Sequence, residues 1–268
     1  MNDGELRELL KGWYTQIDNQ FQVIVKRLEE TSSTLAGDLK KCKYSVFYTN
    51  PLKTLRAGDL YFLGLNPGGD SSKEYDDESS PGYSEEEKRK NWCEYTDAIW
   101  QENGKKTNLQ RRVPEVLGFI LGELDEKQVI KDVFSTNMYF FRSPKGGVLE
   151  SYGEGGDCLK YHKTFLEIVK PKIIICCGNG EDLSAYSILR RRAVEENLCI
   201  AISSEEKKRT YNKVFFLKWF FLAETSWGRS KTLVLGIPHL SRFSPGGCDP
   251  EFYDTLKSLI GQVRSEME

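Results

Sequence analysis

Histidine and long uncharged apolar runs are both scarce in this chain. Only two of its 268 residues are histidine. The longest apolar run, Val214 to Ala223, contains Lys218 and is shorter than the roughly 18 uncharged residues of a membrane span. Met1 to Leu10 is acidic and polar, and it lacks the basic start and apolar stretch of a signal peptide. We therefore expect a protein without membrane contact that is intracellular and cytoplasmic, or nuclear if its source is eukaryotic.

Paired cysteine motifs are also missing. The chain has seven cysteines, an odd number, and none of them are spaced as CxxC. The adjacent pair Cys176-Cys177 lies inside the apolar run Ile173 to Cys177, where thiols behave as small hydrophobic side chains. This pattern indicates a reducing compartment, and it predicts no metal site and no cofactor.

An excess of positive charge is absent as well. Lys and Arg number 38 against 40 Asp and Glu, so the formal net charge is -2. The molecule as a whole has no electrostatic attraction to DNA, and any nucleic-acid contact must use a local basic group. Candidate groups are Lys88 to Lys90, Lys105 and Lys106 with Arg111 and Arg112, and Arg190 to Arg192. The alternative is that these runs are solvated helix faces.

The most informative segment present is an apolar run that stops in a turn. Leu60 to Leu65 is followed by Asn66 and then by Pro67-Gly68-Gly69. Apolar residues bounded by Gly and Pro are typical of a buried strand, and a glycine-rich turn lets the backbone approach a ligand closely. Ligands of open α/β sheets bind beyond the carboxyl ends of the strands, so Asn66 is a candidate site residue. The alternative is a turn without function.

The rest of the chain alternates helical and strand patterns. Apolar strands are predicted at 60–65, 133–141, 173–177 and 232–238, with helices at 5–30, 92–100, 113–124, 159–169, 181–197 and 249–263. This order predicts an α/β fold, a three-layer α/β/α sandwich with a mainly parallel central sheet. We expect residues 1–57 to be an N-terminal helical extension that packs on a 58–268 core domain, within one structural unit. Residues 198–203 and 214–223 are expected to form an inserted hairpin.

Polar groups at three of the expected strand ends can converge. They are Asn66, Asn137 and His239. A carboxamide in an apolar strand is costly to bury unless it is satisfied, and its donor and acceptor suit the edge of a nucleobase. An imidazole after a strand can donate to a developing oxyanion. The alternatives are that Asn137 bonds neighbouring backbone and that His239 is structural. His162, within a polar helical pattern, is expected at the surface.

The motifs GLNPGG with Asn66, STNMYFF with Asn137, PKIIICCG, and PHLSRFS with His239 resemble the uracil-DNA glycosylase superfamily in their order and separation. The first is similar to the Gly-x-Asn-Pro-Gly of its mismatch-specific and single-strand-selective branches. The last is similar to the His-Pro-Ser loop, with Leu240 in place of proline. The resemblance covers about residues 58–263.

The resemblance implies a monofunctional DNA N-glycosylase that removes uracil or a related damaged base from DNA. Asn66 would position the hydrolytic water and His239 would stabilise the departing base, both as catalytic residues. These enzymes turn the base out of the stack into a pocket. Further roles implied for this chain are base binding by Asn137, Tyr83 and Leu65, phosphate binding by Gly68, Gly69 and Ser241, and a strand wedge at Leu240 or Phe243.

Some features of the chain favour other functions. Tyr83 lies seventeen residues after Asn66 in an acidic segment, and Tyr75 is a nearer stacking aromatic. An acidic segment is a poor neighbour for a DNA backbone. One alternative is therefore a catalytically inactive member that binds nucleotides, free bases or nucleic acid. Another is a protein-interaction module whose insertions contact a protein partner.

Overall fold

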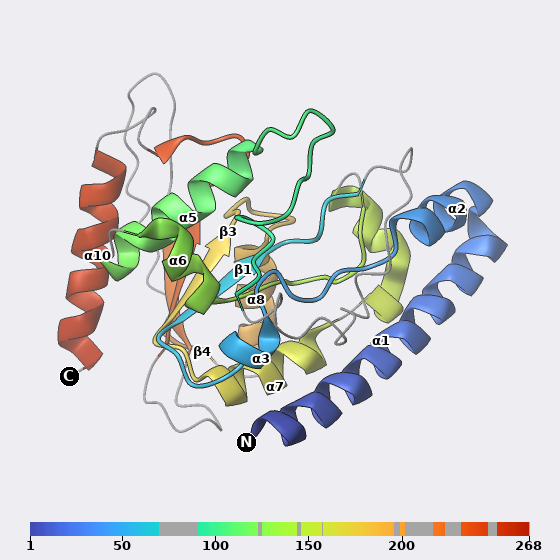
Figure 1. Cartoon of the computed structure of the whole chain (residues 1–268), viewed down its shortest axis with the longest axis horizontal. Helices are drawn as coiled ribbons and strands as arrows, with labels where there is room; N and C mark the ends of the chain where they lie inside the picture. The colour runs from blue at the N-terminus through green and yellow to red at the C-terminus, as the bar shows by residue number, and fades with distance from the viewer. Residues whose placement is uncertain are drawn as a thin grey trace.

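The computed structural model describes residues 1–69, 91–122, 125–143, 146–156, 158–195, 199–201, 217–222, 232–245 and 251–267. The fold is mixed α/β and is built on one mostly parallel sheet (Figure 1). The six strands lie in the order β2-β1-β3-β6-β5-β4. The sheet lies between α1, drawn in blue at one side of the molecule, and α10, drawn in red at the other.

The parallel part of the sheet comprises four strands. They are β1 (Leu60–Gly64), β2 (Phe134–Asn137), β3 (Ile173–Cys177) and β6 (Thr232–Ile237). Every residue of these strands is buried, as expected where both faces of a parallel sheet are covered. Strand β1 pairs with β2 on one side and with β3 on the other, and β3 pairs with β6. The carboxyl ends of all four strands therefore meet at one edge of the sheet.

Two antiparallel strands extend the sheet beyond β6. Strand β5 (Lys218–Leu222) pairs with β6, and β4 (Cys199–Ala201) pairs with β5. The antiparallel pairing of β4 with β5 confirms the hairpin pairing predicted for the insertion. The residues that connect these two strands lie outside the described part of the chain.

One face of the sheet is covered by the N-terminal helices together with two later ones. These are α1 (Asp3–Thr31), α2 (Ser33–Cys42), α7 (Leu159–Val169) and α8 (Ala185–Glu195). A capping box between Asn2 and Glu5 starts α1. Its apolar face shares one buried cluster with Tyr61 and Leu63 of β1. The N-terminal helices therefore contribute directly to the main core.

The opposite face is covered by α5 (Asn108–Leu121) and α10 (Glu251–Met267). Leu60 and Phe62 of β1 point to this side, as the alternation of side chains along a strand requires. Shorter elements connect the layers. They are α3 (Pro51–Thr54), α6 (Glu126–Val129) and the 3-10 helices Ile130–Asp132 and Gly146–Gly156. None of the described helices is long and apolar enough to cross a membrane.

Three local predictions were wrong. Strand β2 ends at Asn137 rather than at residue 141, which places this amide at the end of the strand. Residues 92–100 form turns rather than a helix, because Asp97 bonds back to the Cys93 amide. His162 is buried rather than exposed. Its Nδ1 lies 2.9 Å from the Tyr61 hydroxyl, and its Nε2 lies 3.1 Å from the Met138 carbonyl, so this imidazole ties α7 to the sheet.

Candidate functional site

A cavity of about 660 Å³ opens at the carboxyl edge of the parallel strands. Asn66, Asn137 and His239 all line it. The structure therefore brings together the three polar strand ends that the sequence singled out. Other expected site residues also line this cavity: Leu65, Gly68, Gly69 and Ser241.

Asn66 follows β1, and its amide has a defined polarity. Its Nδ2 donates to the Pro67 carbonyl at 2.8 Å and contacts the Ser143 Oγ at 3.1 Å. A backbone carbonyl can only accept, so the NH₂ must face this side and Oδ1 must face the other. Within the described residues, Oδ1 has no hydrogen-bond partner. Asn66 can therefore accept a hydrogen bond from a water molecule in the cavity.

Asn137 ends β2 directly opposite Gly64 in the register of the sheet. A Cβ on Gly64 would collide with the side-chain oxygen of Asn137. The glycine thus makes room for the amide to lie across the end of β1. Asn137 is 4% exposed, and its Nδ2 is one of two buried side-chain polar atoms without a partner in the described residues. A buried unpaired NH₂ group is costly, and a ligand with an acceptor oxygen would satisfy it.

His239 follows β6 and is held by its own turn. The backbone N–H of Ser241 donates to His239 Nδ1 at 3.3 Å, and the Ser241 hydroxyl lies 2.8 Å from the same atom. A nitrogen that accepts from a backbone N–H carries no proton, so the neutral ring is protonated at Nε2. Desolvation, and secondly the charge of Arg242, lower the pKa of His239 below its ordinary value. Although His239 is exposed, the lowered pKa makes the neutral Nε2–H form the predominant one at neutral pH.

Helix α5 fixes the position of the His239 turn. Arg112 donates to the carbonyls of Leu240 at 2.8 Å and Phe243 at 2.9 Å. Asn108 donates to the Ser241 carbonyl at 3.2 Å. Arg112 was expected to belong to a basic group for nucleic acid. Its charge is instead used to hold backbone, which no sequence pattern indicates.

Sequence reasoning missed an aromatic wall of the cavity. The rings of Tyr48, Tyr95 and Trp100 line it, with centroids 5.3 to 6.1 Å apart. Burial raises the pKa of Tyr95 far above its ordinary value, so this hydroxyl stays neutral. Flat aromatic surfaces in a cavity of this kind suit the stacking of a nucleobase. The richness of residues 92–100 in aromatics is the available signal in the sequence, although the spacing there favours a helix.

Two buried charged residues in the cavity were also missed. Glu94 is 5% exposed, and its carboxylate accepts the Trp100 indole N–H at 2.7 Å. Arg142 is 8% exposed and donates to the Gly68 carbonyl at 3.0 Å. Ionised residues are rarely buried without a function or a partner. The cavity lining thus includes two carboxylates, Glu94 and Glu102, together with a guanidinium, three side-chain amides and an imidazole.

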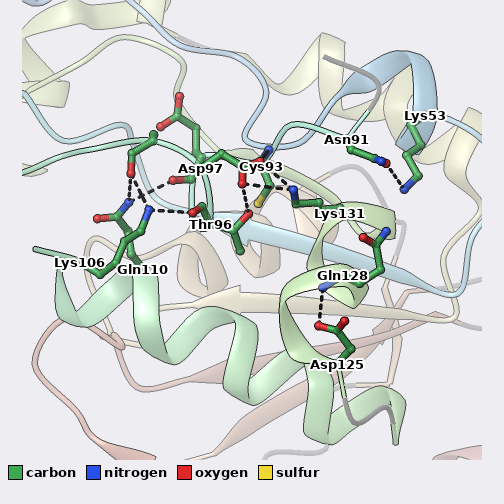
Figure 2. Close-up of polar contacts among 12 residues, drawn as sticks. Lys53, Asn91, Cys93, Thr96, Asp97, Lys106, Gln110, Asp125, Gln128 and Lys131 are labelled. Carbon is green, nitrogen blue, oxygen red and sulfur yellow. Dashed lines mark hydrogen bonds and ion pairs between the residues drawn. The ribbon is translucent and has the colours of Figure 1, made fainter. Parts of the chain in front are cut away.

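The segment of residues 91–107, which we call the rim segment, carries this wall and borders the cavity. Figure 2 shows its anchoring. Lys106 donates to the carbonyls of Thr96 at 2.8 Å and Ala98 at 2.7 Å. Gln110 of α5 donates to the same Ala98 carbonyl at 2.8 Å. Lys106, another member of the expected basic group, is therefore also engaged with backbone.

Some expected site residues are placed elsewhere. Leu240 is fully buried in the core beneath α5 and α10, so the wedge role predicted for it is wrong, because a wedge must project. Phe243 is half-buried, with its ring 5.2 Å from that of Phe252. Tyr83 and Tyr75, the expected stacking aromatics, lie outside the described residues, as do Lys88 to Lys90.

The thiols are not arranged for metal binding in the part of the chain that the structure describes. No group of three or more His, Cys, Asp or Glu that could hold a metal ion is found there. Burial raises the pKa of Cys177 to about 12, so its thiol stays protonated. Cys176 and Cys177 are packed in the sheet as small apolar side chains, as the sequence predicts.

Comparisons with known proteins add no assignment. No family model, no curated protein and no solved structure matches this chain.

Proposed function

We propose that this protein is a uracil-DNA glycosylase-like enzyme that hydrolyses the N-glycosidic bond of uracil or a related damaged base in DNA. The corresponding architecture is the three-layer α/β/α sandwich of that superfamily. The observation that carries the proposal is that three side chains lining one cavity carry polar atoms of complementary type. They are the acceptor Oδ1 of Asn66, the unpaired donor Nδ2 of Asn137 and the donor Nε2–H of His239.

Each of the three groups has a part in a balanced hydrolysis. The C1′–N bond of the nucleotide breaks and its electron pair leaves with the base, while the sugar gains oxocarbenium character. A water molecule oriented by Asn66 Oδ1 forms the new C1′–O bond, and its proton ends on the departing base anion, which leaves as the neutral base. Asn137 binds a carbonyl oxygen of the base, and the neutral His239 donates to an oxygen that becomes anionic. Fixed donors and an oriented water supply this catalysis without a metal ion.

The remaining cavity residues suit the handling of a flipped nucleotide. Tyr95 and Trp100 offer surfaces for the base, taking the place expected for Tyr83. Ser241, Gly68 and Gly69 line the cavity, and we assign the flanking phosphates to them. The partner is DNA that contains a damaged or deaminated base.

The test is incubation with oligonucleotides that carry uracil, hypoxanthine or xanthine, followed by alkaline cleavage of abasic sites. We expect strand breaks at one of these bases. The Asn103→Ala variant is the control for alanine substitution of a cavity asparagine, and it should keep the wild-type excision rate. Asn103 is an exposed asparagine of the rim segment and is not among the residues that line the cavity. Absence of breaks with every base would refute the glycosylase.

A second function is favoured by one specific observation. The unpaired Nδ2 of Asn137 would gain a hydrogen bond from a ligand oxygen whether or not a bond is cut. A catalytically inactive protein that binds a free base, a nucleotide or nucleic acid would use the same cavity. Calorimetric titration with free uracil, free hypoxanthine and the oligonucleotides distinguishes the two. Binding without abasic product supports this second function.

A further inference from the structure

Because Leu240 is buried in the core, the strand-wedge role needs another residue, and the rim segment contains a candidate. Ile99 exposes 74% of its surface. The other exposed large hydrophobic residues in the described ranges are Met1, Val23, Phe119 and Val194, and none of these lines the cavity. Ile99 does line it. A single exposed apolar side chain is ordinary on a protein surface, but one at the mouth of a binding cavity has a ligand within reach.

The backbone on both sides of Ile99 is fixed. The carbonyl of Ala98 accepts from both Lys106 and Gln110. The indole of Trp100 is held by the buried Glu94 carboxylate. The base of the segment is fixed as well, since the Cys93 amide donates to Asp97, and Asp97 also pairs with Lys131 at 3.0 Å (Figure 2). The side chain of Ile99 is therefore presented outward from a braced support.

Flipping of a base leaves a gap in the duplex that an apolar side chain can fill. Proteins that kink or unstack DNA use Phe, Leu, Ile, Met or Pro for this purpose. Phe243 is less suited, because its ring already packs against Phe252. Leu240 is enclosed in the core. The rim segment, drawn in dark green, extends away from the start of α5 (Figure 1).

We infer that Ile99 is the strand wedge of this protein, and that its substrate is therefore double-stranded DNA. This inference rests on the proposed glycosylase. Ile99 inserts between the bases that flank the extruded nucleotide, while Tyr95 and Trp100 receive the base. Ile99 is a positioning residue, since it acts on the stack and not on the bond that breaks. Lys105 is exposed on the same segment, and we assign it to the adjoining phosphate.

The experiment compares single-turnover excision from matched single-stranded and double-stranded oligonucleotides. We expect Ile99→Ala to slow excision from the duplex by about tenfold or more, as the loss of an apolar contact with stacked bases predicts. Excision from the single strand should stay within about twofold of the wild type, because an unpaired strand has no stack to fill. Ile99→Leu, which keeps the apolar volume, should restore the duplex rate.

Val23→Ala is the matched control, since Val23 is a 65% exposed β-branched residue on α1 that does not line the cavity. A second readout is the fluorescence of 2-aminopurine placed next to the target base, which should rise on binding of wild type and less with Ile99→Ala. Equal losses on both substrates, or no loss with Ile99→Ala, would overturn the wedge while leaving the glycosylase intact. A wild-type protein that excises from neither substrate would refute the glycosylase and the wedge with it.

Discussion

The protonation state of a single imidazole determines what the cavity can do. His239 accepts at Nδ1 from the Ser241 amide, and desolvation together with Arg242 lowers its pKa. We predict that His239 titrates below the ordinary histidine pKa of about 6.5 and is neutral throughout the physiological range. Proton NMR of the two histidine rings measures this directly. The signal that His239→Gln removes belongs to His239.

The sign of the shift can be tested at Arg242. Arg242→Ala removes a nearby positive charge, so the pKa of His239 should rise toward its ordinary value. The rise should be partial, since desolvation is the larger cause. Because the folded ring binds its proton more weakly than the unfolded chain does, protonation destabilises the fold only as the pH falls below the ordinary pKa. An unshifted titration in the wild type would contradict the desolvated environment.

The polarity of the Asn66 amide gives a second prediction on a single side chain. Asn66→Ala should cut base excision by roughly a hundredfold or more, as removal of an orienting group in the transition state does. The loss of stability should be small, because Asn66 is only half-buried and its shortest hydrogen bond, to the Pro67 carbonyl, lies within its own turn, while its contacts with Ser143 are longer. The measurement is the single-turnover rate, with Asn103→Ala in parallel. An unchanged rate would assign water positioning elsewhere, and Asp70 is the next candidate in sequence.

At the level of a strand, Gly64 controls where Asn137 lies. The two residues are register partners in β1 and β2, and a Cβ at Gly64 would meet the Asn137 side chain. Gly64→Ala should displace the amide and weaken base binding at least tenfold, with a loss of about 1–3 kcal/mol of unfolding free energy from overpacking. Titration with free base and chemical denaturation measure the two effects.

Gly180→Ala serves as the control for that substitution. A Cβ at Gly180 meets nothing within 4 Å, and this glycine does not line the cavity. It should therefore leave both base binding and stability close to those of the wild type. If Gly64→Ala binds base as tightly as Gly180→Ala does, then Asn137 does not contact the ligand.

The elements themselves show which features a sequence can predict. Strands β1, β3 and β6 were predicted within a residue or two, because each is a continuous apolar run closed by Gly or Pro. The convergence of Asn66, Asn137 and His239 followed from parallel strands ending at one edge. The burial of His162 did not follow, since its partners come from β1 and the end of β2, remote in sequence.

The rim segment was unpredictable for the same reason. Its apolar spacing matched a helix, but its shape depends on long-range donors, Lys131 beside Asp97 and Gln110 beside Ala98. Glu94 and Trp100 therefore entered the cavity without a local signal. Composition also suggested a basic group for nucleic acid, whereas Lys106 and Arg112 use their charge on backbone carbonyls. Tertiary hydrogen bonds of this kind override local patterns.

For the whole molecule, the shared core predicts that the N-terminal helices and the sheet unfold together. Ile17 of α1 is 1% exposed and belongs to the same buried cluster as residues of β1, β2 and β3. Trp13 of α1 packs edge-on against Phe165 of α7, with ring centroids 5.0 Å apart. A helix attached to the outside of a domain that folds without it would not contribute large side chains to the core of that domain.

Ile17→Ala should therefore lower the free energy of unfolding of the whole chain by roughly 2–5 kcal/mol, the cost of a cavity left by a buried aliphatic side chain. Val23→Ala on the same helix, where the side chain is 65% exposed, should change it by about 0.5 kcal/mol or less.

Urea denaturation followed by far-ultraviolet circular dichroism reports the helices. Labelling of the thiol of Cys176, fully buried in β3, reports the sheet. The two probes should give one shared transition that Ile17→Ala moves to lower urea. Two separate transitions, with the Cys176 thiol still protected from labelling after α1 has unfolded, would show that the sheet stays folded without the N-terminal helices.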